Sequence, residues 1–266
     1  MKPKISIITV VLNGKNTIER TIKSVIFQTY PRIEYIIIDG GSTDGTTETI
    51  KKYKRYLAYW TSEPDKGIYD AMNKGAKKST GELLFFLNSD DELFDKRVVS
   101  DSVDFYLRYG EPPVFYGGIK YVNPVAGISY SEIIKARINI GNIRKGRMIR
   151  HQSMFIKRKV LEGLGFFNLE YPLGADFELQ CNLFLKNIRC IFFDRIISIF
   201  HGGGKASNLY TSYKEKSKII KKYFGGIHYY LYLIKRGFFI LCIYIFIKLN
   251  LMEYVLRIRK VLMKNG

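Results

Sequence analysis

Cysteine and acidic residues are scarce in this chain of 266 residues. The three cysteines, Cys181, Cys190 and Cys242, are an odd number without metal-ligand spacing, so they indicate neither a disulfide framework nor a zinc cluster. Asp and Glu number 24 against 43 Lys and Arg, which gives a formal charge of +19. Internal repeats and low-complexity linkers are also missing. With 47% hydrophobic residues, the chain can bury a substantial core, which predicts one α/β domain, with or without an appendage.

Two glycine-rich phosphate-binding motifs are absent. After the first apolar run the chain reads Asn13-Gly14-Lys15-Asn16, and Asp39-Gly40-Gly41 lacks the G-x-G-x-x-G spacing of a dinucleotide site. A Walker-type G-x-x-x-x-G-K-[ST] loop is missing too. A nucleotide is therefore expected to bind through carboxylates and a metal ion.

Apolar runs long enough to span a membrane, about 20 residues, are also lacking. The runs 229–234 and 237–247 are divided by Lys235 and Arg236, and the last 66 residues carry 13 Lys or Arg against two Glu. This mixture of charge and aromatic residues favours helices lying on an anionic membrane surface over nucleic-acid binding. Residues 206–266 are therefore predicted to be a basic, amphipathic helical tail that associates with the membrane. A basic hairpin packed on its own domain or on a partner is the alternative.

The N-terminus resembles a signal peptide only superficially. Lys2 and Lys4 precede an apolar run that ends at Leu12, but Asn13-Gly14-Lys15 follows without a small-residue cleavage site. A first core strand explains the run better. The expected location is the cytoplasm, at the inner face of the plasma membrane.

Apolar, β-branched runs alternate with helical periodicity, which predicts a parallel sheet flanked by helices. Strands are expected at 4–12, 33–38, 57–61, 82–87, 114–116, 152–157 and 188–193, and helices at 16–27, 68–78, 96–109, 177–185 and from a cap at Ser42 or Thr43 to Tyr53. Residues 117–150 are polar and punctuated by glycine, which indicates a lid or pocket wall. Residues 1–205 are expected to form this domain ahead of the tail.

Polar side chains follow the ends of several predicted strands: Asp39, Asp65, Asn88, Asp90 and Asp91. Parallel strands end at one edge of a sheet, where ligands bind, so these side chains are expected to converge. Divalent cations take oxygen ligands and bridge phosphates, so Mg²⁺ or Mn²⁺ with a nucleoside diphosphate is the expected guest. Local turns and helix caps are the alternative explanation of these residues.

Several segments together resemble the family 2 glycosyltransferases of the GT-A fold, particularly bacterial enzymes of surface-polysaccharide assembly. They are Ile5–Asn13, Asp39–Thr46, Glu63–Gly75 and Asn88-Ser89-Asp90-Asp91, with weaker similarity at His151-Gln152-Ser153 and Gly174–Leu179. The resemblance implies a GT-A type, mostly parallel sheet flanked by helices. Its half at 1–92 would bind a nucleotide sugar, and its half at 93–205 would receive the acceptor.

The same resemblance implies roles for single residues. Donor-binding residues would be Thr9, Val11, Asn13, Asp39, Asp65, Lys66, Gly67, Asn73, Asn88, Ser89 and His151. Asn88-Ser89-Asp90 stands where the family usually has Asp-x-Asp, so Asp90 would be the metal ligand, with Asp91 and His201 as weaker candidates. Asn88 departs from this pattern, and a neutral amide binds cations less strongly than a carboxylate. From the residues themselves, the glycine-rich loop that opens at His201 is expected to close over phosphate.

Asp176 matches the family's catalytic base, although Ala175 stands where the family often has Glu. The resemblance implies a single inverting displacement in which Asp176 takes the proton of the acceptor hydroxyl. The alternative is a helix cap. Trp60 is the only tryptophan, so the Gln-x-x-Arg-Trp signature of processive synthases is absent downstream, and one sugar per encounter is expected.

The predicted function is non-processive transfer of a sugar, from a UDP-sugar donor, to a lipid-linked oligosaccharide in cell-surface polysaccharide biosynthesis, as in lipopolysaccharide or capsule. The expected partners are the donor, this acceptor and an anionic membrane surface, and not nucleic acid. A sugar-phosphate nucleotidyltransferase is one alternative, but it usually needs a glycine-rich triphosphate loop near the first strand. A non-enzymatic membrane- or nucleic-acid-binding protein would leave the strand-end carboxylates without a purpose.

Overall fold

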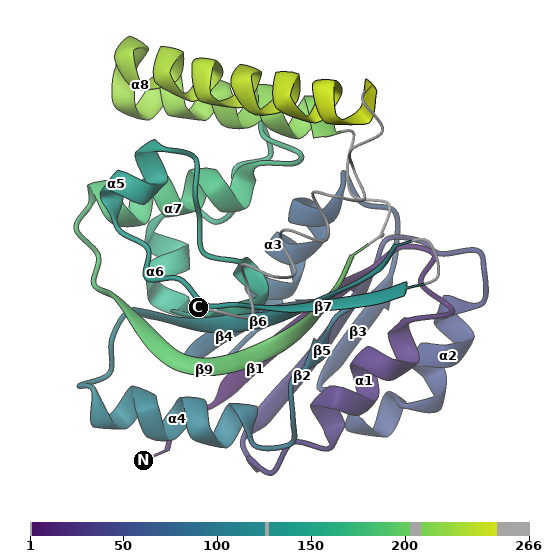
Figure 1. Cartoon of the computed structure of the whole chain (residues 1–266). Coiled ribbons are helices and arrows are strands. Elements are labelled where there is room, and N and C mark those ends of the chain that lie inside the picture. The colour runs from purple at the N-terminus through teal and green to yellow at the C-terminus, as the bar shows by residue number, and fades with distance from the viewer. Residues whose placement is uncertain (1, 126–127, 203–208, 249–266) are drawn as a thin grey trace.

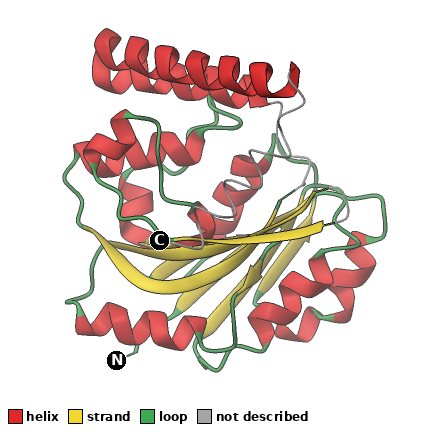
Figure 2. Cartoon of the chain, in the orientation of Figure 1, coloured by secondary structure: helices red, strands yellow, loops and turns green. Residues whose placement is uncertain are grey.

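The computed structural model describes the backbone of residues 2–125, 128–202 and 209–248, and the side chains of 2–122, 131–202 and 211–235. At its centre lies a sheet that has nine strands within these residues. Helices cover both faces of the sheet (Figure 1, Figure 2). The sheet and its helices position the candidate site.

The sheet is parallel in its first half and mixed in its second. The strands are β1 (Ile5–Val11), β2 (Ile33–Asp39), β3 (Tyr59–Ser62), β4 (Leu83–Asn88), β5 (Glu92–Leu93), β6 (Val114–Val125), β7 (Ile128–Ile134), β8 (Met154–Lys157) and β9 (Cys190–His201). Their order is β3-β2-β1-β4-β8-β6-β9-β5, and β7 pairs with β6. Strands β1 to β4 are parallel, β8 is antiparallel to both β4 and β6, and β9 is parallel to β6. Because β8 is antiparallel to its neighbours on both sides, β6 and β9 run in the same direction as β1, β2 and β4. Strand β9 therefore ends at the same edge of the sheet as these strands.

Alternation along the strands divides the core between the two faces. Ile5 and Ile7 point toward helices α1 (Ile18–Ile26), α2 (Thr46–Lys52) and α4 (Val98–Arg108), whereas Ile8 and Val10 point toward α3 (Ile68–Lys78), α6 (Arg158–Gly163) and α7 (Ala175–Leu185). Successive strand residues face opposite sides, so a strand buried on both faces is apolar throughout. Burial on both faces explains why the run at 4–12, which predicted a first core strand, is apolar almost throughout.

Helix α8 (Leu209–Lys248) forms a further layer over α7 and the short helix α5 (Ile140–Arg144) (Figure 1). Ile219 and Ile220 are fully buried in one cluster with Phe177 of α7. At Gly225 the backbone has φ 79° and ψ 179°, a conformation that glycine tolerates, and the helix is kinked there. The first half of α8 is therefore packed into the folded unit. No helix in the described residues has the length and apolarity needed to cross a membrane.

The polar stretch at 117–150, expected to shape a lid or pocket wall, contains strands in its first part. Strand β6 continues to Val125 and pairs with β7. The glycines are there for packing: a Cβ at Gly117 would lie 2.4 Å from the carbonyl oxygen of Arg195, and one at Gly118 would lie 2.9 Å from that of Ile134. Strand β9 likewise runs to His201 rather than to 193.

The predicted cap of α2 is also wrong. The helix begins after Gly45, whose φ is 97°, and this N-cap position makes no side-chain cap bond. The Ser42 hydroxyl donates instead to Asp39, and the Thr43 amide donates to the Asn13 side chain at 3.0 Å. Both residues are used to fix loops at the sheet edge rather than to start the helix.

Candidate functional site

A cavity of about 590 Å³ opens at the sheet edge where β1, β4 and β9 end. The predicted site residues that line it are Val11, Asn13, Asp65, Gly67, Asn88, Ser89, Asp90 and His201. They come from four separate segments of the chain. Parallel strands deliver their carboxyl ends to this edge, which is why residues up to 190 positions apart converge.

The loops behind the cavity are tied together by hydrogen bonds to Asn13 and Asp39. The Asn13 amide donates to Ser42 Oγ at 2.7 Å, and its own backbone has φ 53°. Asp39 is fully buried, and it accepts hydrogen bonds from the Ser42 amide at 2.9 Å and from Ser62 Oγ at 2.5 Å. Asp39 therefore joins the ends of β2 and β3.

Asp65 closes one side of the cavity. Its Oδ1 accepts a hydrogen bond from the Gly67 amide at 2.8 Å, and a Cβ at Gly40 would lie 2.4 Å from its Oδ2. The carboxylate thus lies directly against the backbone that follows β2. Glycine at position 40 leaves room for this contact.

The turn after β4 holds the candidate metal ligands. Asp90 lines the cavity, and burial raises the pKa of its carboxyl group. Asn88 also lines the cavity, and its Oδ1 is buried with no hydrogen-bond partner among the described residues. In the parts of the chain with described side chains, no three His, Cys, Asp or Glu side chains form a metal-binding cluster.

Asp91 faces the interior instead. It is fully buried, its Oδ1 accepts a hydrogen bond from the His201 amide at 3.1 Å, and its carbonyl accepts one from Thr21 Oγ1 at 2.7 Å. Burial, and then the neighbouring charge of Asp90, raise the pKa of this carboxyl group well above its usual range. Asp91 therefore fastens the end of β9 to the turn after β4.

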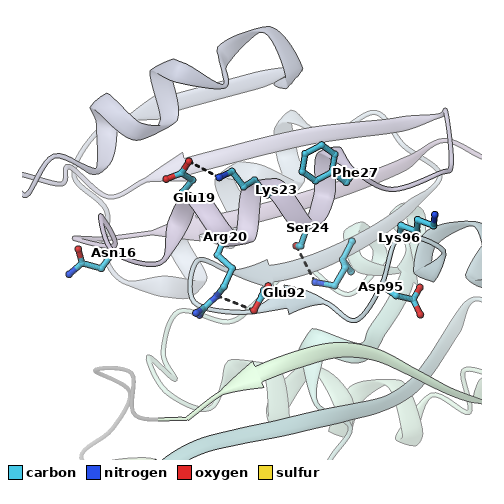
Figure 3. A pocket seen from close by; sticks show the side chains of 10 residues that line it. Asn16, Glu19, Arg20, Lys23, Ser24, Phe27, Glu92, Asp95 and Lys96 are labelled. Atoms are coloured by element: carbon cyan, nitrogen blue, oxygen red, sulfur yellow. Dashed lines mark hydrogen bonds and ion pairs between the residues drawn. The ribbon is translucent and has the colours of Figure 1, made fainter.

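His201 is linked to helix α1 through a shared carboxylate. Its Nε2 lies 2.9 Å from Glu92 Oε1, and the Arg20 Nε lies 3.0 Å from the same oxygen. Arg20 also donates to the carbonyl of Asp90 at 2.9 Å and lines the cavity. Figure 3 shows Arg20 directed at Glu92 in a second cavity, of about 580 Å³, between α1 and the segment at 92–96.

Asp176 stands in the first turn of α7 and forms a pair with His151. The Asp176 Oδ2 lies 3.1 Å from the Nδ1 of His151, and its Oδ1 accepts a hydrogen bond from the Phe177 amide at 2.8 Å. Only 13% of the Asp176 side chain and 11% of the His151 side chain are exposed. Burial alone would raise the pKa of Asp176, but the hydrogen bond and charge of His151, together with a hydrogen bond from Tyr69, lower it.

Several predicted donor-binding residues lie away from the cavity lining. Thr9 is fully buried inside β1, with its Oγ1 3.2 Å from the hydroxyl of Tyr35. Both ends of the buried Asn73 amide group are bonded to the backbone of Phe167, at 2.8 and 3.0 Å. Lys66 is exposed beside the cavity loop. Thr9 and Asn73 are thus committed to packing and to a link between α3 and the segment after α6.

Arg20 and Tyr69 belong to the site although the sequence did not single them out. Tyr69 lies within the 63–75 block, at the start of a predicted helix, and this position was a usable signal that it lies near the site. In the structure, Ile68 and Ala71 of the same helix line the cavity. Arg20 had no such signal. Its position depends on the packing of α1 against β5, which periodicity does not specify.

Sequence comparison identifies relatives of known family. Residues 6–165 match the family Glycosyl transferase family 2. An uncharacterized glycosyltransferase of Mycobacterium tuberculosis is 32% identical over 201 residues, which cover 71% of this chain and 73% of that protein. A PGL/p-HBAD biosynthesis glycosyltransferase of Mycobacterium bovis is 28% identical over 195 residues, covering 71% and 70% of the two chains.

Solved structures have the same fold. Residues 1–349 of TarS from S. aureus, in complex with UDP-GlcNAc, superpose with a TM-score of 0.65 and 18% identity over 81% of this chain and 65% of that one. The mannosyltransferase PcManGT from Pyrobaculum calidifontis, in complex with GDP-Man and Mn²⁺, gives 0.63 and 16% over 84% and 64%. The chain thus spans just under two thirds of each solved chain. The predicted α/β fold is confirmed, and with the match over residues 6–165 this protein belongs to glycosyl transferase family 2.

Proposed function

We propose that this protein moves one sugar at a time from a nucleotide-sugar donor to a hydroxyl acceptor, with inversion at the anomeric carbon. The observation that carries the proposal is the juxtaposition of two acidic centres. Asp90 lines the cavity at the end of β4, and the 3-10 helix His151–Ser153, whose first residue pairs with Asp176, packs against β4. A displacement needs one centre for the departing diphosphate and another for the acceptor proton.

The donor cavity suits a nucleotide sugar. Its volume of about 590 Å³ lies within the roughly 300 to 1,000 Å³ that small-molecule sites occupy. TarS was solved with UDP-GlcNAc and PcManGT with GDP-Man, so donors of both bases occur in this fold. We take a UDP-sugar as the donor. The test is Mn²⁺-dependent binding and hydrolysis across UDP-GlcNAc, UDP-glucose, UDP-galactose, GDP-mannose and dTDP-rhamnose.

The residues at the end of β4 fit a divalent cation. Asp90 offers a carboxylate to the cavity, and the unpartnered Oδ1 of Asn88 is a buried oxygen of the kind that Mg²⁺ and Mn²⁺ prefer. Two protein oxygens leave coordination positions for the donor's phosphates and water. When bound, the cation would stabilise negative charge on the departing diphosphate.

Asp176 is the carboxylate on which removal of the acceptor proton depends. The Asp176→Asn variant keeps the shape of the side chain and loses its charge, so turnover should fall by roughly 10²- to 10⁴-fold while donor affinity stays near the wild-type value. Steady-state turnover and calorimetric donor binding measure the two quantities. Asp194→Asn, on a side chain that is 74% exposed, is the matched control. Near wild-type turnover of Asp176→Asn would contradict the proposal.

The acceptor is proposed to be a lipid-linked oligosaccharide at the inner face of the plasma membrane. Beyond the kink of α8, four large apolar side chains are 58 to 71% exposed, namely Ile227, Tyr230, Leu231 and Ile234. Their spacing places them on one face of the helix, and exposed Lys221, Lys222 and Lys235 lie close to them in the sequence. An apolar stripe bordered by cations suits an anionic membrane surface. The lipid diphosphate of such an acceptor is anionic at its head and apolar below.

A further inference from the structure

Arg20 is the only lysine or arginine among the described residues that line the donor cavity. Asp65 and Asp90 present carboxylates to the same cavity. A diphosphate is itself anionic, so a cavity that binds it needs positive charge close to the phosphates. Arginine keeps its charge at any physiological pH. Within the described lining, Arg20 is therefore the one permanent cation that the protein itself offers to such a ligand.

The guanidinium group of Arg20 is held in place by the turn after β4. Its Nε lies 3.0 Å from Glu92 Oε1, and its Nη2 donates to the carbonyl oxygen of Asp90 at 2.9 Å. His201 Nε2 lies 2.9 Å from the same Glu92 oxygen, which ties the end of β9 to this arrangement. Figure 3 shows Arg20 leaving α1 toward Glu92. A side chain that is already ordered loses less conformational entropy when a ligand binds.

The other edge of the guanidinium group is free for a ligand. Glu92 and Asp90 take the side formed by Nε and Nη2, and Nη1 makes no hydrogen bond within the part of the chain that the structure describes. The Arg20 side chain is 42% exposed. Guanidinium presents its N–H donors as a rigid fork that matches two phosphate oxygens. The cavity that Arg20 lines thus has an oriented phosphate-binding group at its wall.

The contact with Asp90 places the guanidinium group beside the proposed cation. That cation would be held by the Asp90 carboxylate and the Asn88 Oδ1, and it would bridge the phosphates of the donor. Arg20 binds the main chain of Asp90, so the cation and the guanidinium group would share the diphosphate between them. Because Asn88 carries no charge, the cation is held less strongly than by two carboxylates. A second, fixed positive charge compensates for this.

Resting on the proposed glycosyl transfer, we propose that Arg20 binds the diphosphate of the donor and stabilises the negative charge that develops on it as it departs. The acceptor oxygen forms a bond to the anomeric carbon, and its proton moves to Asp176. The bond from that carbon to the diphosphate oxygen breaks, and its electron pair stays on the diphosphate. Arg20 remains protonated throughout and acts by charge and by hydrogen bonds that strengthen as this charge grows.

Nucleotide binding in EDTA tests this contact apart from turnover and from metal affinity. UDP, GDP and dTDP are each titrated into the full chain beside their own nucleosides, with calorimetry for the diphosphates and NMR for the weaker nucleosides. Arg20→Gln should weaken binding of the preferred diphosphate roughly 10- to 100-fold, as expected for hydrogen bonds between charged groups, and leave the nucleoside unaffected. Arg20→Lys should lie between, because a point charge replaces the fork.

Lys23→Gln is the matched control for the loss of a cation from α1. Lys23 lies one turn beyond Arg20, pairs with Glu19 at 3.0 Å and lines the second cavity but not the donor cavity. This variant should bind both ligands as the wild type does. Wild-type affinity for the diphosphate in Arg20→Gln would overturn the proposal. Equal losses for the diphosphate and the nucleoside would also overturn it, because Arg20 would then only fasten α1 to the turn after β4.

This proposal and the proposed function fail differently. If the wild type binds none of the nucleoside diphosphates, with or without Mn²⁺, the proposed function is contradicted, and inorganic pyrophosphate then tests Arg20 alone. Pyrophosphate that binds the wild type and not Arg20→Gln would support the contact, and pyrophosphate that binds neither would overturn it. If the wild type prefers a diphosphate to its nucleoside and Arg20→Gln keeps that preference, only the role of Arg20 is overturned. Circular dichroism checks each fold, and Arg20→Lys carries the test if Arg20→Gln does not fold.

Discussion

At the residue scale, Asn88 is the position where this chain departs most from the pattern expected of its cavity. An amide oxygen ligates a divalent cation more weakly than a carboxylate because it carries no net charge. Burial raises the pKa of Asp90, which means that the cavity already disfavours negative charge when no cation is present. In the proposed cation site, one amide and one carboxylate would therefore be a compromise between cation affinity and repulsion in the absence of the cation.

Exchange of this amide for a carboxylate should strengthen cation binding. Asn88→Asp is expected to tighten Mn²⁺ binding in the presence of UDP on the order of tenfold, and Asp90→Asn to weaken it by a similar factor. Electron paramagnetic resonance of free Mn²⁺ measures both without turnover. Asn187→Asp makes the same charge change on the exposed turn after α7. Equal Mn²⁺ affinity in the wild type and Asn88→Asp would place the cation away from β4.

At the scale of single elements, the contact between α3 and β1 positions one wall of the cavity. Helix α3 carries Ile68 and Ala71 into the lining, and Gly75 lies where the helix approaches the strand most closely. A Cβ at Gly75 would lie 2.4 Å from Ile8 Cγ2, a side chain that is 1% exposed. Glycine inside a helix lowers its propensity, but here it permits close packing.

Gly75→Ala should therefore destabilise the fold despite the better helix propensity of alanine. Overpacking should cost about 1 to 3 kcal/mol in the free energy of unfolding, and donor affinity should fall because α3 shifts. Gly163→Ala is the control, since a Cβ at the end of α6 meets nothing within 4 Å. It should leave stability unchanged or slightly raised. Chemical denaturation that finds Gly75→Ala as stable as the wild type would contradict this account of the packing.

At the scale of the whole molecule, two features bear on the proposed membrane contact. They are the net charge of +19 and the position of α8 as an outer layer over α5 and α7. The first half of α8 is part of the folded unit, because Glu215 accepts a hydrogen bond from the Leu173 amide at 2.9 Å and Ile219 is buried. The second half presents the exposed stripe. A truncation that tests the proposed membrane contact must therefore begin after the kink at Gly225 rather than near 210.

Removal of residues 226–266 should release the protein from vesicles of anionic lipid and leave it folded. Leu231→Glu with Ile234→Glu in the full chain should weaken binding strongly, and Leu107→Glu, at an exposed position on α4, should not. Sedimentation with phosphatidylglycerol vesicles measures both, and binding should decrease as salt is raised. Unchanged sedimentation of the double variant would contradict the role of the stripe.

Much of the first half of the fold could be predicted because its signals are local. The helix at 68–78 and the strands to Asn88 follow from the spacing of apolar side chains, and Asp90 follows directly from the end of such a strand. Strands β6 and β7 could not be predicted in the same way. Gly117 and Gly118 of β6 are explained by close contacts with the carbonyl oxygens of Arg195 in β9 and Ile134 in β7. Both partners are distant in the sequence, so the local pattern does not reveal these contacts.

Sequence alone determined the alternation of strands and helices, the basic tail and the segments that reach the sheet edge. Tertiary structure decided which of those residues face the cavity. In the structure, Thr9, Asn73 and Asp91 are buried rather than facing the cavity. Asp176 pairs with His151, which lies 25 positions earlier in the chain. The reason is that hydrophobic periodicity reports burial averaged along an element, whereas a hydrogen-bonded pair depends on how separate elements pack in three dimensions.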